Sequence, residues 1–309
     1  MLDKPTYMID PSAMKNMACD RKFLFTVKDG YHYTKLNPAM EWGSAFHTFA
    51  ASYYKGTELK ESMQAGLVYY QTRLAQGLRV KEKDQRNLVR LVEAITLYAK
   101  KYPLEKDSFK VEQNSKGACI EQSFGIPLYC GEKYNIVFSG TIDLIGTYRG
   151  EKVFMDHKTT SNYLTQSGKF FESYELDTQF LAYNWALSYL ANLKDSKLSE
   201  YKNAGGLVNG IFNTRSKVEF ERSPLIEYPD HLRASFDKYM RGSFLKKVRD
   251  LIENGPSSYG WACDSCSLKF GKCCYWEVCN RPDGVDAETM MTMLDYETKP
   301  YNPLNHGRL

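Results

Sequence analysis

Residues 139–160 read SGTIDLIGTYRGEKVFMDHKTT, which are two runs of strand-forming residues separated by Arg149-Gly150. Glycine tolerates the positive φ of a tight hairpin turn, and this pair is therefore the natural two-residue loop. Counting outward from such a loop places Asp143 directly opposite Asp156. The sequence thus predicts a β-hairpin that carries two facing carboxylates.

Two facing carboxylates favour a positive charge between them. Cross-strand neighbours stand about 4.5–5.5 Å apart at Cβ, where like charges destabilise a sheet. Lys158 is two residues beyond Asp156 and shares its face. Hard oxygen ligands suit Mg²⁺ or Mn²⁺, which lowers the pKa of bound water while a nearby lysine positions it. The pattern predicts a metal-dependent hydrolase.

A plainer interpretation of the hairpin stays open. Asp143 and Asp156 could lie on a solvated sheet face, with Lys158 as an ordinary salt-bridge partner. The pairing also depends on loop length, since one more loop residue would place the two carboxylates on opposite faces.

The rest of the chain alternates between helical and strand patterns. Asn37, Pro38 and Gly56 are suited to begin and end one helix, and Asp177 is suited to cap another. The order of elements favours an α/β domain with a helical insertion over a helix bundle. Helices are predicted at about 12–25 (capped by Ser12), 37–56, 177–193 and 229–254, and an interrupted helical region at 58–101. Strands are predicted at 118–129, 134–148 and 152–160, and a pair of strands at 205–220.

Composition narrows the class of protein. The 309 residues carry a net charge of +4, which permits a polyanionic partner without requiring one. No signal-like segment opens the chain and no run of about 18 apolar residues occurs, so we expect a soluble, cytoplasmic protein with no membrane partner. Five of the eight cysteines fall within 263–279, which in a reducing compartment favours metal binding. Cys119 and Cys130 are interpreted as small core residues.

Four short motifs occur in a characteristic order. They are G-x-x-x-H at Gly43–His47, G-x-x-D at Gly140–Asp143, D-x-K at Asp156–Lys158 and Q-x-x-x-Y at Gln179–Tyr183. Together they resemble the PD-(D/E)XK nuclease superfamily, and within it the RecB-like branch that includes the AddB nuclease domain, phage RecB-type nucleases and the CRISPR adaptation nucleases.

The resemblance implies a fold and its boundaries. We expect a restriction-endonuclease-like α/β core, with a mixed central sheet flanked by helices. Residues 1–284 would form a single nuclease domain, with a helical insertion at about 50–115 and a Cys-rich metal segment at 263–279. Residues 285–309 would be a polar C-terminal tail.

The resemblance also implies roles at the site. Asp143, Asp156 and His47 would be metal ligands, together with the main-chain carbonyl of His157. Lys158 would be the catalytic lysine. The side chain of His157 should point to the opposite face of the strand and is not counted as catalytic.

Three further residues are candidates for the same site. Gln179 and Tyr183 are one helical turn apart and could touch substrate or orient the lysine, or they could belong to an ordinary amphipathic helix. Glu121 resembles an acidic position of this branch, as a further ligand or as a group behind the ligands.

The cysteines resemble an iron-sulfur site. In several RecB-like nucleases one N-terminal and three C-terminal cysteines hold a [4Fe-4S] cluster that joins the chain ends. The matching set here is Cys19, Cys266, Cys273 and Cys279, with Cys263 as a substitute. Zn²⁺ is an alternative metal, since four thiolates also hold zinc.

The function implied is a metal-dependent DNA nuclease, expected to act as an exonuclease in recombination, repair or phage DNA processing. Its partners would be DNA, as single strands or duplex ends, and a helicase or recombination protein, because the sequence has no P-loop. Two alternatives stay open: a nuclease-fold module that binds DNA without cutting, and a Cys-metal structural or interaction protein.

Overall fold

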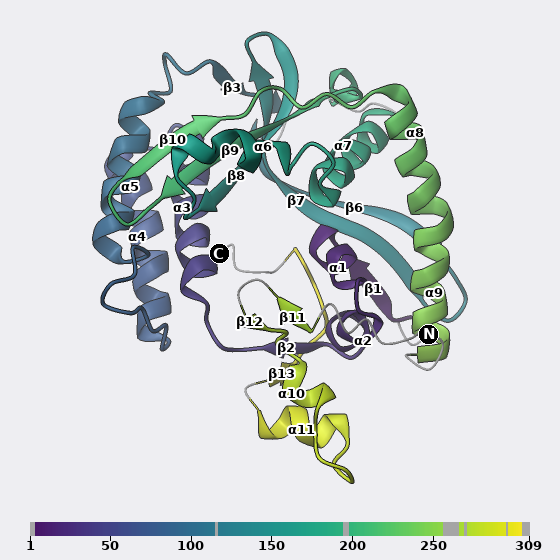
Figure 1. The fold of residues 1–309 in the computed structure, drawn as a ribbon. Coiled ribbons are helices and arrows are strands. Elements are labelled where there is room, and N and C mark those ends of the chain that lie inside the picture. Colours follow the sequence, from purple (N-terminus) through teal and green to yellow (C-terminus); the bar gives the residue numbers. More distant parts are fainter. Residues whose placement is uncertain are drawn as a thin grey trace. The chain divides into compact units, whose positions relative to one another are not determined.

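The computed structural model describes residues 4–114, 117–193, 198–255, 266–268, 271–294 and 296–304 of the protein. The chain divides into two compact units. One comprises Met1–Lys35, Phe124–Gly140 and Ala234–His306, and the other comprises Leu36–Ser123, Thr141–Arg233 and Gly307–Leu309. The long strands β6 (Ile120–Cys130) and β7 (Asn135–Tyr148) contribute to both (Figure 1).

The second of these units contains the predicted hairpin. Strand β8 (Glu151–Thr160) pairs antiparallel with β7, with Tyr148 opposite Glu151 and Leu144 opposite Met155. Arg149 and Gly150 form the loop with φ of 53° and 93°. The register counted from the sequence is therefore confirmed over this ladder.

Parallel and antiparallel pairings combine in this sheet. Strand β9 (Gly205–Asn213) runs parallel to β8 and pairs antiparallel with β10 (Val218–Arg222), while β3 (Phe109–Val111) pairs with the end of β7. The strand pair expected at 205–220 is thus present. The short strands β4 (Gln113–Asn114) and β5 (Gly117–Ala118) pair with each other.

Helices cover both faces of this sheet. Side chains alternate along its strands, so apolar residues of β8 point to both faces and pack against helices on each. Val153 and Met155 pack into a buried cluster with α3 (Pro38–Tyr54), α4 (Leu59–Ala75) and α5 (Leu88–Lys101). Phe154 points the other way and contacts Phe180 and Tyr183 of α7 (Thr178–Ala191). The mixed α/β fold with a sheet flanked by helices is confirmed.

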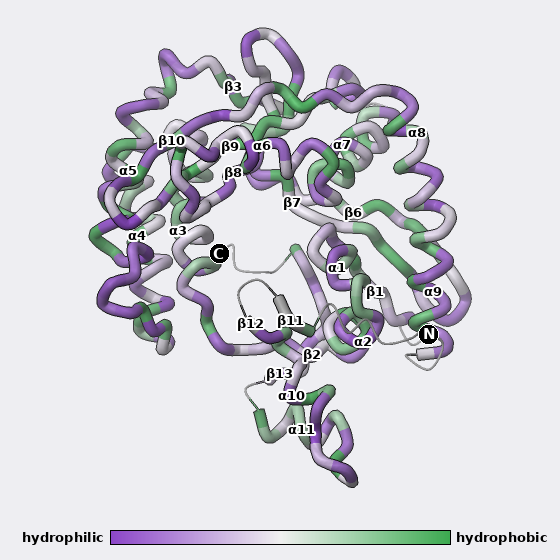
Figure 2. Tube along the Cα trace, in the orientation of Figure 1, coloured by the Kyte–Doolittle hydropathy of each residue, from purple (hydrophilic) through white to green (hydrophobic). Residues whose placement is uncertain are grey.

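The predicted caps of two helices are present. Asn37 accepts from the N–H of Ala39 at the start of α3, and Asp177 accepts from the N–H of Gln179 at the start of α7. Hydrophobic and hydrophilic residues are interspersed along α5 (Figure 2), and its buried residues recur at helical spacing, as expected for a helix with one buried face. The unit also contains α6 (Ser167–Glu172) and the 3₁₀ turns Leu164–Gln166 and Ser199–Tyr201.

The other unit joins the N-terminal segment to the C-terminal one. Strand β1 (Thr6–Ile9) pairs parallel with β7, and β2 (Tyr31–Tyr33) pairs with β13 (Tyr296–Thr298). The residues after 285, whose sequence has little periodicity, thus include a paired strand. The unit's other elements are α1 (Pro11–Asn16), α2 (Asp20–Phe23), the π-helical turns Leu24–Lys28 and Met240–Phe244, α8 (Asp230–Tyr239), α9 (Leu245–Asn254), β11 (Ser267–Leu268), β12 (Gly271–Lys272), α10 (Trp276–Cys279) and α11 (Ala287–Met293).

Two local expectations were wrong. The helix expected at about 12–25 is interrupted between α1 and α2, and Asp10, not Ser12, caps α1 by accepting from the N–H of Ala13. Cys119 is buried as predicted, but Cys130 is exposed at the end of β6, where the strand leaves the core. Among the residues that the structure describes, no helix has the length and apolar character needed to cross a bilayer.

Candidate active site

The two hairpin carboxylates are buried where β7 and β8 separate. Asp143 and Asp156 are each 1% exposed. Just beyond the Leu144–Met155 pair, the main-chain N–H of His157 donates to Oδ2 of Asp143 at 2.9 Å. A side chain has taken the place of a ladder carbonyl, and this ties the position of Asp143 to the backbone of β8.

Helix α3 brings His47 to Asp143. Gly43 allows the close approach of this helix to β8, since a Cβ there would lie 3.2 Å from Oγ1 of Thr159. One turn later, Nδ1 of His47 lies 3.0 Å from Oδ2 of Asp143. The spacing of the G-x-x-x-H motif therefore has a physical reason. The glycine allows α3 to pack close to β8, and the histidine one turn later can then reach Asp143.

Glu121 completes a group of three potential ligands. One ligand atom from each of His47, Glu121 and Asp143 lies within 4.8 Å of the other two, and among the described residues no other three His, Cys, Asp or Glu side chains come together in this way. Glu121 has a φ of 49°, which costs a residue with a side chain about 1–3 kcal/mol. Strain of this kind gathers at functional sites, and here it accompanies a carboxylate near two other ligands.

Asp156 lies beside an ammonium instead. Its Oδ2 is 2.6 Å from Nζ of Lys158, and Nζ also donates to Oε1 of Gln179 at 2.8 Å. Gln179 Nε2 contacts Asp156 Oδ1 at 3.3 Å and donates to the hydroxyl of Tyr183 at 2.9 Å. The hairpin and the Q-x-x-x-Y helix thus form one network around the lysine.

The electrostatics of this network favour a bound cation. Burial raises the pKa of Asp156, and the neighbouring charge of Asp143 adds to that rise. Burial alone would lower the pKa of Lys158, but the charge of Asp156, its hydrogen bond to the ammonium and the charges of Tyr174 and Asp143 together outweigh burial, and the pKa is raised. Two buried carboxylates beside one ammonium leave negative charge that a divalent cation would neutralise.

Tyr174 is a neighbour that the sequence reasoning missed. Nζ of Lys158 lies 6.0 Å from the centre of its ring, within the range of a cation–π contact. Burial raises the pKa of Tyr174 to about 12. Tyr174 stands in the turn before α7 with no motif around it, so no sequence pattern could have identified it.

The side chain of His157 lies on the opposite face, as expected. Its ring stacks on Tyr54 and meets Phe46 edge-on, inside the aromatic core between the sheet and the helices. The ring also meets that of His47 edge-on, with 5.6 Å between ring centres. His157 therefore binds Asp143 through its backbone and contacts His47 through its side chain.

The cysteines gather in the other unit. Burial raises the pKa of the Cys279 thiol, and the thiols of Cys19 and Cys273 lie close enough to interact with it. A hydrogen bond from Cys274 lowers the pKa of Cys273, which favours its thiolate. Cys266 is connected to this group through its carbonyl, which accepts from the N–H of Cys273 at 2.9 Å. Cys263 lies outside the described residues.

The order of the four motifs and their convergence in the fold agree with a match to a known protein family. The sequence profile of the PD-(D/E)XK nuclease superfamily matches residues 13–280. The chain belongs to the PD-(D/E)XK nuclease superfamily. This membership supports a metal-dependent phosphodiester hydrolase with DNA as substrate, and the PD-(D/E)XK nucleases use divalent metals such as Mg²⁺ or Mn²⁺. No curated protein matches the chain significantly.

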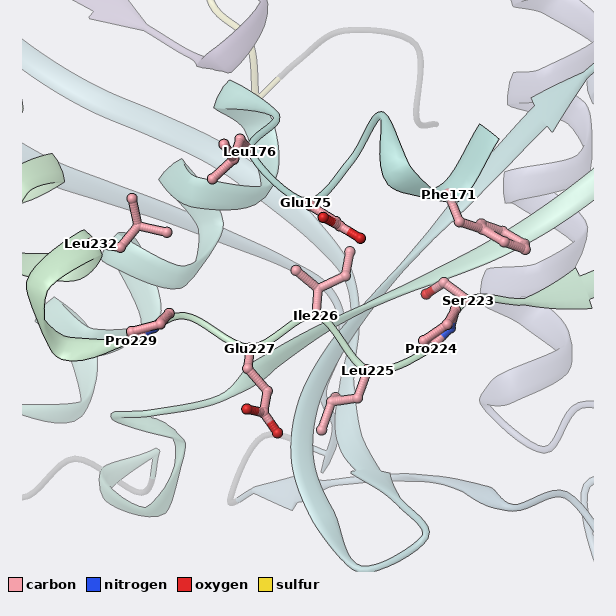
Figure 3. A pocket seen from close by; sticks show the side chains of 10 residues that line it. All are labelled: Phe171, Glu175, Leu176, Ser223, Pro224, Leu225, Ile226, Glu227, Pro229 and Leu232. Carbon is pink, nitrogen blue, oxygen red and sulfur yellow. The ribbon is translucent and has the colours of Figure 1, made fainter. Parts of the chain in front are cut away.

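This PD-(D/E)XK protein also has a pocket of about 420 Å³, which is lined by residues close in sequence to Tyr174 and by the segment after β10 (Figure 3). Its lining includes Glu175 and Leu176, which directly follow Tyr174, and Ile226 and Glu227 of the segment after β10. The lining residues include none of the predicted site residues. Two glutamates and several apolar side chains make it a poor place for DNA phosphates.

Proposed function

We propose that this chain is a Mg²⁺- or Mn²⁺-dependent DNA nuclease of the RecB-like branch that acts as an exonuclease on ends or single strands. One observation carries the proposal. His47, Glu121 and Asp143 converge beside the buried Asp156, which pairs with the partly exposed Lys158, so ligands for a cation and a positioned ammonium occur together.

The side chains fit a hard divalent cation. Two carboxylates and an imidazole supply oxygen and nitrogen donors, and water and substrate phosphate fill the remaining positions around Mg²⁺ or Mn²⁺. Asp156 and the main-chain carbonyl of His157 are further proposed ligands. A cation bound there would lower the pKa of water and stabilise charge on the phosphoryl oxygens.

Lys158 has the central role among the side chains. Asp156 and Gln179 hold its ammonium from two sides, which limits the positions that Nζ can take. The raised pKa keeps Lys158 charged at neutral pH. A fixed ammonium can orient an attacking water and stabilise the negative charge that develops on the phosphate. Gln179, held in turn by Tyr183, positions the lysine.

We further propose that Cys19, Cys266, Cys273 and Cys279 hold a [4Fe-4S] cluster. The electrostatic interaction of the Cys279 thiol with those of Cys19 and Cys273 supports this. The hydroxyl of Tyr275 donates to the carbonyl of Tyr31 and hydrogen-bonds with the hydroxyl of Thr26, which joins the same two chain segments. Anaerobic purification followed by iron analysis and visible absorption tests it. An iron-free, zinc-containing protein would replace the cluster with Zn²⁺.

The biological process proposed is DNA recombination, repair or phage DNA processing. A helicase or a recombination protein would supply unwound DNA, since the sequence carries no P-loop.

The test is DNA cleavage by the purified chain. Linear and circular DNA, each single- and double-stranded, are incubated with Mg²⁺, with Mn²⁺ and with a chelator. Degradation of the linear substrates only when Mg²⁺ or Mn²⁺ is present, with the circular substrates left intact, supports an exonuclease. Cutting of circles would make the enzyme an endonuclease. Tight DNA binding without cutting under any metal would favour the alternative of a nuclease-fold binding module.

A further inference from the structure

A line of buried polar side chains runs from the ring of His157 into the core. Asn209 is the parallel-strand partner of His157. Its Nδ2 lies 2.7 Å from Nδ1 of His157 and 2.6 Å from the hydroxyl of Tyr98. The Tyr98 hydroxyl in turn lies 2.9 Å from that of Tyr54. Asn209 and Tyr98 are completely buried.

The line ends on an ion pair. The hydroxyl of Tyr54 donates to Oδ2 of Asp107 at 3.1 Å, and the guanidinium of Arg222 donates to both carboxylate oxygens of Asp107. The side chains of Arg222 and Asp107 are 4% and 1% exposed. Burying such a pair removes two charges from water, which makes it a weak source of stability.

The donor of each hydrogen bond can be assigned outward from Asn209. An amide nitrogen can only donate, so Asn209 donates to Nδ1 of His157 and to Tyr98. Tyr98 is then left to donate to Tyr54, which donates to Asp107. Each member of the chain is thereby fixed by its neighbour, and the ring of His157 is held at one end by a network anchored on a charge.

The same residue holds the site through its backbone. The N–H of His157 binds Asp143 at 2.9 Å, and Asp143 meets His47 at 3.0 Å. A displacement of the His157 ring would shift its Cα and the adjoining peptide groups, and the ring also meets the ring of His47 edge-on at 5.6 Å. The position of the His157 ring is therefore coupled, through the backbone of His157, to the carboxylate of Asp143, which faces the proposed metal position.

We propose that Asn209, Tyr98, Tyr54 and the Asp107–Arg222 pair are positioning residues for the metal site, acting through His157 on Asp143. This rests on the proposed function only in naming the cation as Mg²⁺ or Mn²⁺. None of these side chains is proposed to touch DNA or the metal.

The test compares two tyrosines of the same aromatic core. Tyr98→Phe removes the hydroxyl that joins Asn209 to Tyr54. Tyr53→Phe is the matched control, because its hydroxyl donates to the carbonyl of Tyr102 at 3.0 Å and is outside the line. The measurement is the affinity of the DNA-free protein for Mn²⁺ by titration calorimetry, with thermal unfolding measured alongside.

Tyr98→Phe is expected to weaken Mn²⁺ binding about 10-fold, a typical effect of losing a group behind the ligands. Tyr53→Phe is expected to lower the Tm similarly and to leave the affinity unchanged. Equal affinities in both variants and the parent would overturn the proposal, as would equal losses in both.

A double variant separates positioning from a general loss of packing. In an Asn209→Ala background the line is already broken, so Tyr98→Phe should cause no further loss of Mn²⁺ affinity. Additive losses would contradict action through Asn209. The readout is binding of Mn²⁺ alone, so a parent protein that binds Mn²⁺ and cuts no DNA would refute the proposed function and leave this test intact.

Discussion

The main-chain N–H of His157 donates a 2.9 Å hydrogen bond to Oδ2 of Asp143, at the point where the two hairpin strands separate. The bond fixes a buried carboxylate against the strand that carries Asp156 and Lys158. It also leaves Asp143 within reach of His47 on α3 and of Glu121 on β6. The site is therefore built at a break in the sheet, where backbone groups that would pair with each other are available to side chains.

Asp143→Asn should weaken Mn²⁺ binding strongly, because the amide loses the charge that attracts the cation. It should also raise the Tm of the metal-free protein, since Asp143 and Asp156 are both buried and their repulsion is relieved. Thermal unfolding in chelator and in excess Mn²⁺ checks both effects. A Tm that falls in chelator would mean that the bond to His157 outweighs the repulsion.

Glu121 allows backbone strain to be separated from ligand loss. Glu121→Gly and Glu121→Ala both remove the carboxylate, and both should weaken Mn²⁺ binding. Only glycine accepts a φ of 49° freely, so Glu121→Gly should be more stable than Glu121→Ala by about 0.5–1 kcal/mol. Urea unfolding of the two variants measures the difference. Equal stabilities would mean that the backbone at this position is unstrained.

Gln179→Ala should lower the cleavage rate about 10–100-fold with little change in Mn²⁺ affinity, because Gln179 holds the ammonium of Lys158 and is not placed among the three converging ligands. Single-turnover cleavage at saturating Mn²⁺ is the measurement. Gln76→Ala, an exposed glutamine after α4, is the control. A loss of metal affinity equal to the loss of rate would instead place Gln179 among the groups that hold the metal.

The Asp107–Arg222 pair predicts a pH effect on stability. Burial alone would raise the pKa of Asp107, but the hydrogen bonds and charge of Arg222 outweigh it and the pKa is lowered. A lowered pKa in the folded state stabilises the protein above the unfolded value, and this contribution is lost as the pH falls through the folded one. The free energy of unfolding should therefore fall below about pH 4.

A variant checks the assignment of that fall. Asp107→Asn leaves Arg222 buried without a charged partner and should cost about 3–5 kcal/mol at pH 7. The parent and the variant should then converge in stability as the pH falls below about 4. A constant difference down to pH 2 would assign the acid sensitivity to other carboxylates.

Local rules predicted much of this molecule. The Arg149-Gly150 loop fixed the register of the hairpin because side chains alternate strictly along a strand, and Asn37 and Asp177 capped their helices through bonds to the next few residues. The convergence of His47 with Asp143 was implied by the order of motifs. Its reason, the close approach permitted at Gly43, became visible only once the helix and β8 were placed.

What the sequence could not supply depends on distant segments. The left-handed backbone of Glu121 has no signature around it, because a glutamate normally avoids that region. Tyr174 reaches Lys158 from a turn, and Tyr98 and Asn209 meet although they are 111 residues apart. Tertiary packing determines such contacts, and the periodicity of the sequence does not predict them.

The central claim is that Lys158 serves cleavage and that the carboxylates serve the metal. The most direct measurement is single-turnover cleavage of linear DNA by Lys158→Ala at saturating Mg²⁺ or Mn²⁺. Lys217→Ala, whose lysine pairs with Glu219, is the control. We predict a rate at least about 100-fold below that of the parent for Lys158→Ala, with the control at the parent's rate. Cleavage by Lys158→Ala as fast as by the parent would contradict the account.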